Sequence, residues 1–326
     1  MKKGITMGLF EIAVDIGSCN ICMGLIGTEK IISEPAVVAV AVDSDKIVET
    51  GAAALALCET KKQSYKAVYP ISGGLIADKR CAVKLINGIC RRLLPDMNYE
   101  PQIRAVIAVM PGIALSELKA IEAVFIAAGI SPVIFKESGV AASRCIFPEY
   151  HINCGTIVNI GYEKTEISVV ENGRILDACT VFLGGKYIDQ SIGYAMLDGF
   201  GLAIDSRESA AIKEKCLSFK TNDITTMIVN GISVRTSEVS DRRVTARDFY
   251  NLACAHAERI ALAVNSLLNS VGEEKLSEIM AAGIFIIGGC ARLYRLDGFI
   301  SGCLQLPVRI PVQPELCVVR GVVRTS

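Results

Sequence analysis

One loop pattern occurs twice in this chain, and it constrains the fold more than any other feature. The two runs are Asp15-Ile16-Gly17-Ser18-Cys19-Asn20 and Asn159-Ile160-Gly161-Tyr162-Glu163-Lys164-Thr165. Each run follows an apolar stretch and precedes another, which predicts a strand, a tight glycine-containing turn and a return strand. Each hairpin tip offers backbone N–H groups and small polar side chains. Two facing hairpins of this kind can hold a polyphosphate between them.

The two copies differ in their chemistry. The first keeps an acid, Asp15, whose carboxylate suits a hydrated Mg²⁺ ion, and Gly17 there lets the backbone approach phosphate closely. Ser18 and Asn20 add further hydrogen-bonding groups. The second copy has Asn159 in place of the acid, and it has bulky or charged residues where the first has small ones. This asymmetry predicts one competent and one impaired phosphate loop.

Composition favours a globular protein of two domains. The chain has 326 residues, of which 51% are hydrophobic and 21% charged, so it exceeds the usual size of one core. Lys plus Arg and Asp plus Glu are equal at 34 each, which gives no electrostatic reason to expect nucleic acid as a partner. No apolar run approaches the roughly 20 residues of a membrane span.

The 13 cysteines contain one CxxC pair, Cys19 and Cys22, and no second pair or nearby histidine completes a zinc site. We interpret them as small buried residues in a reducing cytosol, with disulfides as the alternative. The two histidines, His151 and His256, are far apart in sequence, which argues against a histidine triad, and we expect His256 to pack within its helix.

Hydrophobic periodicity predicts the same order of elements in both halves, a meander of strands followed by helices. A long helix should begin at a capping residue, Thr245, and the turn Asn172-Gly173 predicts a hairpin. This alternation implies two related α/β domains around a cleft, where ligands of such folds bind. The expected meander strands are residues 11–16, 21–26 and 37–42 in the first half and 156–160, 165–170 and 178–183 in the second.

Two charged residues outside the loops are candidates for chemistry. Glu137 begins a helix after a strand and is placed to orient or deprotonate an attacking water; the alternative is an acid favoured by the helix dipole. Lys213 lies in a predicted helix over residues 206–216, within reach of a nucleotide base or ribose. From sequence alone a solvated lysine is the simpler interpretation.

Several segments together resemble the MreB family of bacterial actin-like rod shape-determining proteins over nearly the whole chain. Residues 12–18 and Asn20 resemble its first phosphate loop, and residues 33–39, SEPAVVA, resemble its NEPSVVA segment. Residues 73–78 resemble its DGVIAD segment with Gly73 in place of the acid, and residues 137–142 resemble its EPMAAA helix start. Gly288-Gly289 resembles its adenosine-side loop, and residues 314–321 resemble its C-terminal DPLxCVAxG pattern.

The resemblance implies an actin-like, ribonuclease H-like α/β fold with four subdomains around a nucleotide cleft. Domain I would cover residues 1–150 and 311–326, with a small subdomain at about 33–68, and domain II residues 151–310, with a small subdomain at about 186–243. ATP and Mg²⁺ are the implied cofactors, with Glu137 catalytic and Asp15 holding Mg²⁺ through water. The implied nucleotide-binding residues are Asp15, Gly17, Ser18, Cys19, Asn20, Asn159, Gly161, Thr165, Lys213, Gly288 and Gly289.

The implied partners are other copies of the chain in a filament, the cytoplasmic face of the membrane and the proteins of cell-wall elongation. Residues 7–10, MGLF, follow two lysines and resemble the family's apolar membrane anchor. Residues 93–97, LLPDM, fall where a second membrane-touching loop would lie. We therefore expect a cytoplasmic, membrane-associated protein.

The departures from the family pattern concern turnover. The family's second phosphate loop reads DIGGGTT, whereas Asn159 here cannot supply the negative charge that helps to hold Mg²⁺, and Glu163 brings a carboxylate near phosphate. In the family's AExIK helix, Ala210 stands at the ribose-side glutamate, although Lys213 is kept. We expect a filament-forming protein with weakened ATP binding and slow or absent hydrolysis. The alternatives are an active ATPase in which Lys164 and a shifted Mg²⁺ site compensate, and a monomeric actin-fold chaperone or reactivating factor.

Overall fold

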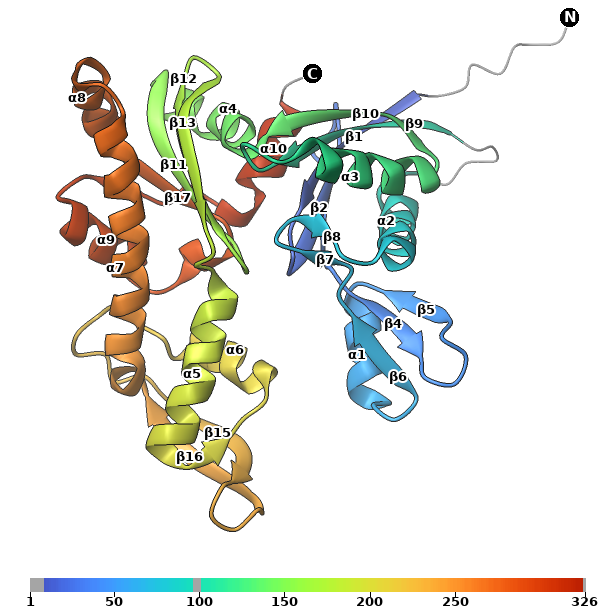
Figure 1. Ribbon diagram of the computed structural model, residues 1–326, viewed down its shortest axis with the longest axis vertical. Coiled ribbons are helices and arrows are strands. Elements are labelled where there is room, and N and C mark those ends of the chain that lie inside the picture. Colours follow the sequence, from blue (N-terminus) through green and yellow to red (C-terminus); the bar gives the residue numbers. More distant parts are fainter. Residues whose placement is uncertain (1–8, 96–100, 325–326) are drawn as a thin grey trace, which may run out of the picture. The chain divides into compact units, whose positions relative to one another are not determined.

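The structure is a computed structural model, and it describes residues 9–95 and 101–324. The chain divides into two compact units, one formed by residues 1–153 with 316–326 and the other by residues 154–315. Each unit is built on one five-stranded sheet, and Figure 1 labels its elements. Of the two expected membrane contacts, residues 7–10 and 93–97, positions 7, 8, 96 and 97 lie outside the described ranges.

The large sheet of the first unit has the order β10-β9-β1-β2-β3. Strands β1, β2 and β3 form an antiparallel meander, and β9 and β10 add in parallel beside β1. The carboxyl ends of β1, β9 and β10 therefore meet at one edge of the sheet. The strand bounds are β1 Leu9–Ile16, β2 Asn20–Leu25, β3 Ile31–Pro35, β9 Gln102–Val109 and β10 Ile130–Glu137.

Helices and a smaller sheet complete the first unit. The small sheet has the order β5-β4-β6, a short hairpin pairs β7 with β8, and α1 packs on the small sheet. The helices are α1 Ala52–Thr60, α2 Lys79–Leu93, α3 Leu115–Ala127, α4 Ser138–Tyr150 and α10 Cys317–Val323. The remaining strands are β4 Val38–Ala41, β5 Ile47–Thr50, β6 Tyr65–Val68, β7 Ile71–Ser72 and β8 Leu75–Ile76.

Small residues let the C-terminal helix α10 approach closely. A Cβ added at Gly24 of β2 would lie 2.8 Å from a Val323 methyl, and one added at Gly321 would lie 1.6 Å from the Ala141 carbonyl oxygen on α4. Alternate residues of β1, Ile12 and Val14, belong to the apolar core that contains residues of α2 and α3. Both faces of this sheet are thus covered, which explains its continuous apolar strands.

The large sheet of the second unit repeats this topology, with the order β13-β12-β11-β17-β18. It again has an antiparallel meander, β11 to β13, followed by two parallel strands beside the first. The repeat agrees with the expectation of two related α/β halves. The strand bounds are β11 Cys154–Ile160, β12 Thr165–Glu171, β13 Arg174–Val181, β17 Ile284–Ile287 and β18 Val308–Arg309.

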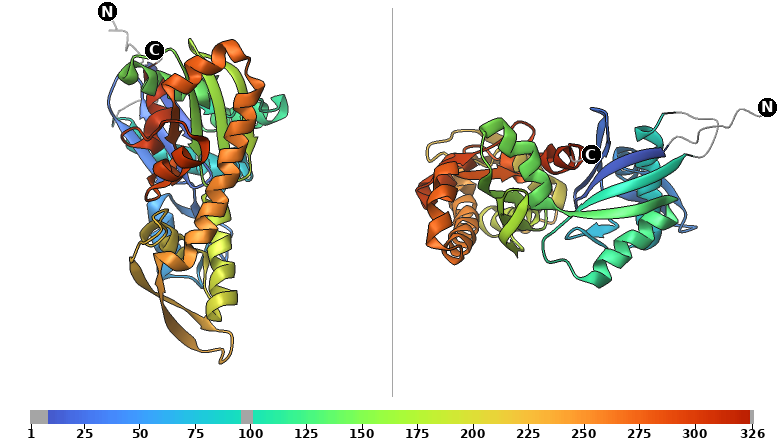
Figure 2. Two further views of the ribbon diagram at one scale, coloured as in Figure 1. Left: turned by 90° about the vertical axis from the view of Figure 1, so that its left-hand side faces the viewer. Right: turned by 90° about the horizontal axis from the view of Figure 1, so that it is seen from above.

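The long helix α7 connects the parts of the second unit, as the orange helix in Figure 2 shows. Thr245 begins it as expected, and the Asp248 carboxylate accepts hydrogen bonds from the N–H and hydroxyl of Thr245. A three-stranded sheet, β14-β15-β16, lies in the same unit. The helices are α5 Gly185–Phe200, α6 Ser206–Lys215, α7 Ala246–Ser270, α8 Glu273–Ala282 and α9 Leu296–Leu304, with 3₁₀ turns at Gly289–Arg292 and Pro314–Leu316. The small-sheet strands are β14 Leu202–Ala203, β15 Thr226–Ser233 and β16 Val239–Thr245.

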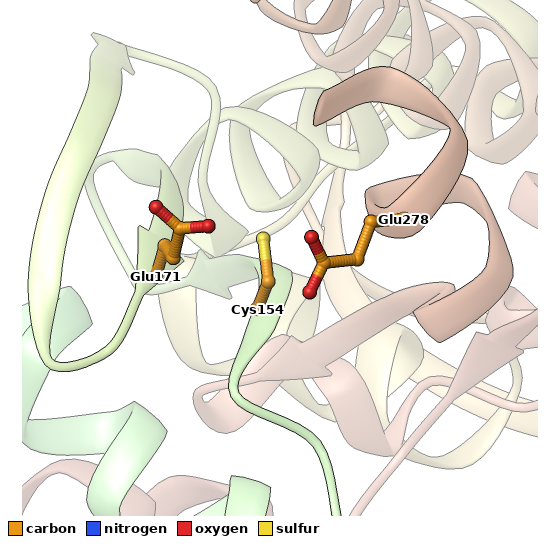
Figure 3. Close-up of side chains that lie close together, drawn as sticks. All are labelled: Cys154, Glu171 and Glu278. Atoms are coloured by element: carbon orange, nitrogen blue, oxygen red, sulfur yellow. The ribbon is translucent and has the colours of Figure 1, made fainter. Parts of the chain in front are cut away.

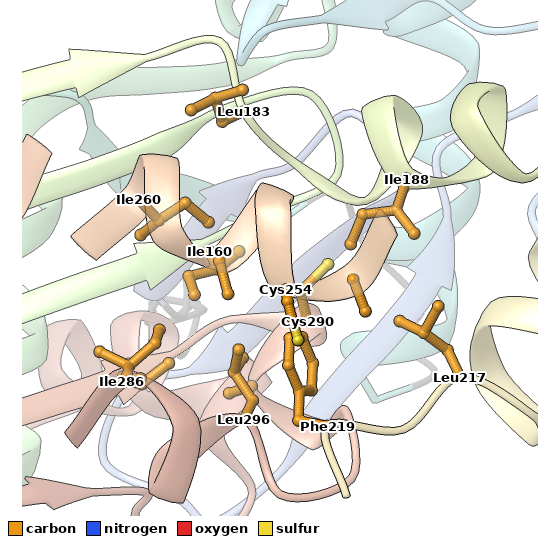
Figure 4. Packing of buried hydrophobic residues seen from close by; sticks show 14 of the residues in the cluster. Ile160, Leu183, Ile188, Leu217, Phe219, Cys254, Ile260, Ile286, Cys290 and Leu296 are labelled. Carbon is orange, nitrogen blue, oxygen red and sulfur yellow. The ribbon is translucent and has the colours of Figure 1, made fainter. Parts of the chain in front are cut away.

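One apolar core fills the second unit. Figure 4 shows side chains from the sheet, the helices and the loops meeting there, among them Ile160, Ile188, Ile260 and Ile286. The core includes residues on both sides of the second hairpin, Ile160 before its turn and Leu183 after β13. Packing around the hairpin therefore fixes its position in this unit.

Two expected strands differ from the observed ones. Residues 37–42 do not form the third meander strand; β3 takes that place, and β4 belongs to the small sheet instead. Pro35 misled the prediction, because it ends an edge strand where its missing N–H costs nothing. Strand β13 begins at Arg174 instead of at residue 178, since the Asn172-Gly173 turn returns the chain directly into pairing with Glu171.

All 13 cysteines lie in the described part of the chain, and none of them forms a disulfide there. Within residues 9–95 and 101–324, no helix has both the length and the apolar composition needed to span a bilayer.

Candidate functional site

The first repeated run is the β1–β2 hairpin, with a turn whose polar atoms reach its surface. Ile16 pairs with Ile21 across the turn, and Cys19 and Asn20 are exposed while Gly17 and Ser18 are half-buried. A Cβ at Gly17 would lie 2.4 Å from the Asn20 carbonyl oxygen, so this turn requires glycine. Because the tip is small and polar, it fits a phosphate group.

Two predicted acids lie at the same edge of the first unit's sheet. Asp15 on β1 pairs with Ala108 on β9, and Glu137, the last residue of β10, pairs with Val109 of the same strand. Because neighbouring strands are about 4.8 Å apart, the Cα atoms of the two acids are roughly 10 Å apart across β9. Glu137 is exposed and immediately precedes α4. This edge, where the carboxyl ends of parallel strands meet, is the place where α/β folds bind ligands.

The second repeated run is the β11–β12 hairpin, and its turn has the same length. Ile160 pairs with Thr165, as Ile16 pairs with Ile21, so four residues separate the last pair in both copies. Asn159 occupies the register position of Asp15, one pair before the turn. Thr165 is fully buried, and its hydroxyl donates to the Leu183 carbonyl.

Backbone groups that would serve a phosphate in the second unit are bonded within the protein. The N–H of Gly185, at the start of α5, donates to the Gly161 carbonyl at 3.0 Å. The N–H of Lys186 donates to the Tyr162 carbonyl at 2.7 Å, and the Gly161 N–H donates to the Lys164 carbonyl at 2.9 Å. The N-terminus of a helix attracts anions because its first N–H groups are unsatisfied. Here the carbonyl oxygens of the hairpin satisfy two of them.

Both charged residues of the second turn have partners of opposite charge. Lys164 Nζ lies 2.8 Å from a Glu166 carboxylate oxygen, and both side chains are largely buried. Glu163 lies 2.7 Å from Lys186 Nζ. Lys164 is therefore engaged with Glu166, which stands opposite Asn159 on the neighbouring strand.

Lys213 lies in a buried polar cluster and not in solvent. Its Nζ is 2.9 Å from Asp189 Oδ2 and 5.4 Å from the centre of the Tyr162 ring, and it is 7% exposed. The Tyr162 hydroxyl hydrogen-bonds to the Asp189 carboxylate. Burial raises the pKa of Asp189, while its bonds to Lys213 and Tyr162 favour the ionised form. The lysine charge is thus neutralised inside the unit.

Gly288 and Gly289 adjoin the second hairpin. Gly288 has φ +86°, and a Cβ there would lie 2.5 Å from the Ile160 carbonyl and 2.6 Å from Asn159 Oδ1. The next residue but one, Cys290, donates its thiol to the Gly161 carbonyl at 3.4 Å. The second unit therefore brings together its predicted residues Asn159, Gly161, Thr165, Lys213, Gly288 and Gly289.

The two hairpins fit a nucleotide differently. The first has a polar tip beside two acids, and its residues fit phosphate and a hydrated Mg²⁺ ion. In the second hairpin, Tyr162, Glu163 and Lys164 and the first turn of α5 are all bonded to each other or to neighbouring groups. Sequence reasoning missed Asp189, the partner of Lys213. The signal that could have found it is an acidic residue at the fifth position of the helix that begins just after Gly184.

Comparisons with known proteins agree with this architecture. The family model described as "MreB/Mbl protein" matches residues 10–326. The cell shape-determining protein MreB of Pasteurella multocida is 26% identical over 325 residues, covering 96% of this chain and 92% of the relative. The cell shape-determining protein Mbl of Bacillus subtilis is 25% identical over 327 residues, covering 95% and 94%.

Solved structures share the fold at lower identity. MreB5 of Spiroplasma citri bound to ADP superposes with a TM-score of 0.89 at 21% identity, covering 97% of this chain and 95% of that one. MamK, solved as a double helical filament, has a TM-score of 0.79 at 17% identity, covering 97% and 98%. The chain therefore belongs to the MreB/Mbl protein family and has an actin-like two-domain α/β fold.

Proposed function

We propose that this chain is a filament-forming, cell-shape-determining cytoskeletal protein in which ATP binding is weakened and hydrolysis is slow or absent. The names of its relatives support the cell-shape role, and the MamK filament supports self-association. The MreB5 structure with ADP supports nucleotide binding by this fold.

The observation that carries the weakened site is the buried cluster of Tyr162, Asp189 and Lys213 beside the second hairpin. For Lys213 to contact a nucleotide, its bond to Asp189 would have to break, leaving a buried carboxylate without its charge partner. That exchange is costly, because an uncompensated buried charge loses solvation that no new contact restores. Polymer contacts between copies of the chain need not require turnover.

A loop variant tests the weakened site directly. The triple variant Asn159→Asp, Tyr162→Gly, Glu163→Gly restores an acid and removes the ring and the second carboxylate. We expect it to bind ATP with Mg²⁺ about tenfold or more tightly than the parent chain in calorimetry, since one nearby charge contributes about 1 to 4 kcal/mol. The matched control is Tyr162→Phe, which keeps the ring and should leave the affinity weak. Equal affinities for the parent and the triple variant would contradict the proposal.

Phosphate release separates slow turnover from the active alternative. The alternative of an active ATPase requires Lys164 to contact the phosphate. The ion pair between Lys164 and Glu166 supports a structural role for this lysine instead. We expect the purified parent chain to release phosphate no faster than a Glu137→Gln variant. A clear excess of the parent rate over that variant would favour the active enzyme.

Assembly separates the filament protein from a monomeric chaperone of the same fold. We expect light scattering and electron microscopy of the full chain to reveal filaments. A chain that stays monomeric under all nucleotide conditions would favour the chaperone.

Sedimentation with anionic lipid vesicles tests membrane association, for which Leu9, 54% exposed at the start of β1, is a described residue of the expected anchor. Removal of residues 1–8 should abolish sedimentation. Wall-elongation proteins remain the expected partners at that membrane.

A further inference from the structure

Three metal-ligating side chains converge in the second unit, away from the hairpin turn. Cys154 begins β11 and Glu171 ends β12, and the two residues are directly opposite in the strand register. Glu278 reaches the same point from α8, which packs against β11. The thiol sulfur and one oxygen of each carboxylate all lie within 4.8 Å of one another, as Figure 3 shows.

The cysteine is the unusual member of this cluster. Cys154 is 1% exposed, and its sulfur points between the two carboxylates in Figure 3. In the described part of the chain, no side chain forms a hydrogen bond with this thiol. The buried sulfur and the two carboxylates therefore present one sulfur and two oxygen ligands to the same point.

A cation already lies against both acids. Lys275 Nζ forms an ion pair with Glu171 and is 3.9 Å from Glu278. Its side chain is 45% exposed, so it can turn toward solvent and leave the acids to another cation. Glu278 is also exposed, with 52% of its side chain accessible, which gives an ion a path from solvent to the buried sulfur.

We propose that Cys154, Glu171 and Glu278 bind one divalent transition-metal ion of the zinc class. Zn²⁺ accepts thiolate sulfur at about 2.3 Å and carboxylate oxygen at about 2.0 to 2.2 Å, so its ligand atoms are about 3.5 Å apart in a tetrahedron. The observed cluster has to contract by about 1 Å, a movement that the exposed Glu278 side chain permits.

The ligand set selects the class of ion. Mg²⁺ and Ca²⁺ prefer oxygen ligands alone, whereas zinc and its relatives accept sulfur and oxygen together. Binding replaces the thiol proton, which passes to solvent, and involves no change of oxidation state. A water completes the fourth position. The bound ion would join the ends of β11 and β12 to α8, so it would stabilise this corner of the unit.

Titration of the purified full chain with Cd²⁺ or Co²⁺ tests the proposal, because a metal-bound thiolate gives a charge-transfer absorption. We expect one equivalent to produce the band, Zn²⁺ to displace it, and Cys154→Ser to abolish it. The matched control is Cys179→Ser, a half-buried cysteine on β13, which should leave the band unchanged. Glu278→Gln, at an exposed position, should weaken binding at least about tenfold.

Lys275→Gln provides a test of opposite sign. Removal of the competing ammonium group should tighten Cd²⁺ binding, whereas loss of a merely structural lysine would leave the affinity unchanged. A band that survives Cys154→Ser, or an affinity that responds to neither Glu278→Gln nor Lys275→Gln, would mean adventitious binding to other thiols and would overturn the site. These measurements use no nucleotide, so their outcome is independent of the ATP proposal.

Discussion

His256 is a buried imidazole whose protonation should control the acid stability of the second unit. It lies on α7, is 3% exposed and stacks on the Tyr187 ring with centroids 5.4 Å apart. Neither ring nitrogen has a hydrogen-bond partner, and the guanidinium of Arg259 lies over the same tyrosine. Burial lowers the pKa of His256 from 6.5 to about 4, and the positive charge of Arg259 contributes further. The folded protein therefore holds this imidazole neutral.

The direction of the pH effect follows from these two pKa values. Above pH 6.5 the imidazole is neutral in both the folded and the unfolded chain, and the stability is fully present. As the pH falls from 6.5 toward 4, the unfolded chain binds a proton that the folded chain excludes, so stability is lost. A difference of about 2.5 units corresponds to about 3 kcal/mol at the acid limit, and to about 2 kcal/mol at pH 5.

Urea unfolding at pH 7.5 and pH 5 measures this loss. Other groups also titrate in this interval, so the decisive quantity is the difference from His256→Phe, which keeps an aromatic ring and removes the ionisable nitrogens. We expect the parent chain to lose about 2 kcal/mol more than this variant between the two pH values. His151→Asn, a change at an exposed left-handed position, should behave as the parent does. NMR of histidine-labelled protein that placed the pKa of His256 near 6.5 would refute the reasoning.

Further substitutions test the polar cluster, the packing and the helix cap. Lys213→Met should destabilise the fold by about 3 to 5 kcal/mol by leaving Asp189 buried and unpaired, and adding Asp189→Leu should recover most of it; a fully stable single variant in urea unfolding would contradict this. Gly321→Ala should cost more than about 2 kcal/mol because its Cβ meets a backbone carbonyl at 1.6 Å, whereas Gly302→Ala on α9, with open space around it, should stabilise by up to about 1 kcal/mol in thermal melts. Asp248→Ala should lower the free energy of unfolding by about 1 kcal/mol through loss of the cap, and an unchanged midpoint would show that α7 needs none.

Local signals predicted the two hairpins and the start of α7 from sequence. A glycine turn between apolar runs needs only neighbouring residues to form, and Thr245 caps its helix through a residue three positions away. The place of residues 37–42 was less accessible, because the choice between the large and the small sheet depends on packing between distant segments. The resemblance to the family supplied the site residues, but it gave no information on what each would contact.

The partners of the site residues were beyond sequence reasoning for a physical reason. Lys213 on a helix surface is solvated by default, and its burial depends on Asp189, 24 positions earlier on another helix. Cys154 and Glu278 are likewise brought together by α8 packing on β11. Such contacts follow from the tertiary fold, and a single sequence carries no periodicity that marks them.

The contrast between the two hairpins suggests how an actin-like fold can change its chemistry and keep its architecture. The repeated sheet order and equal turn length indicate that the second hairpin is held by its surroundings, Ile160 and Leu183 in the core and the start of α5 beside it. The turn side chains can therefore change while the backbone stays in register. Tyr162 and Glu163 then bond to neighbouring groups of the same unit, and the charge of Lys213 is compensated by Asp189. If this account holds, restoring the small residues should free those groups and leave the architecture intact, so the affinity for ATP should rise while unfolding stays a single cooperative transition.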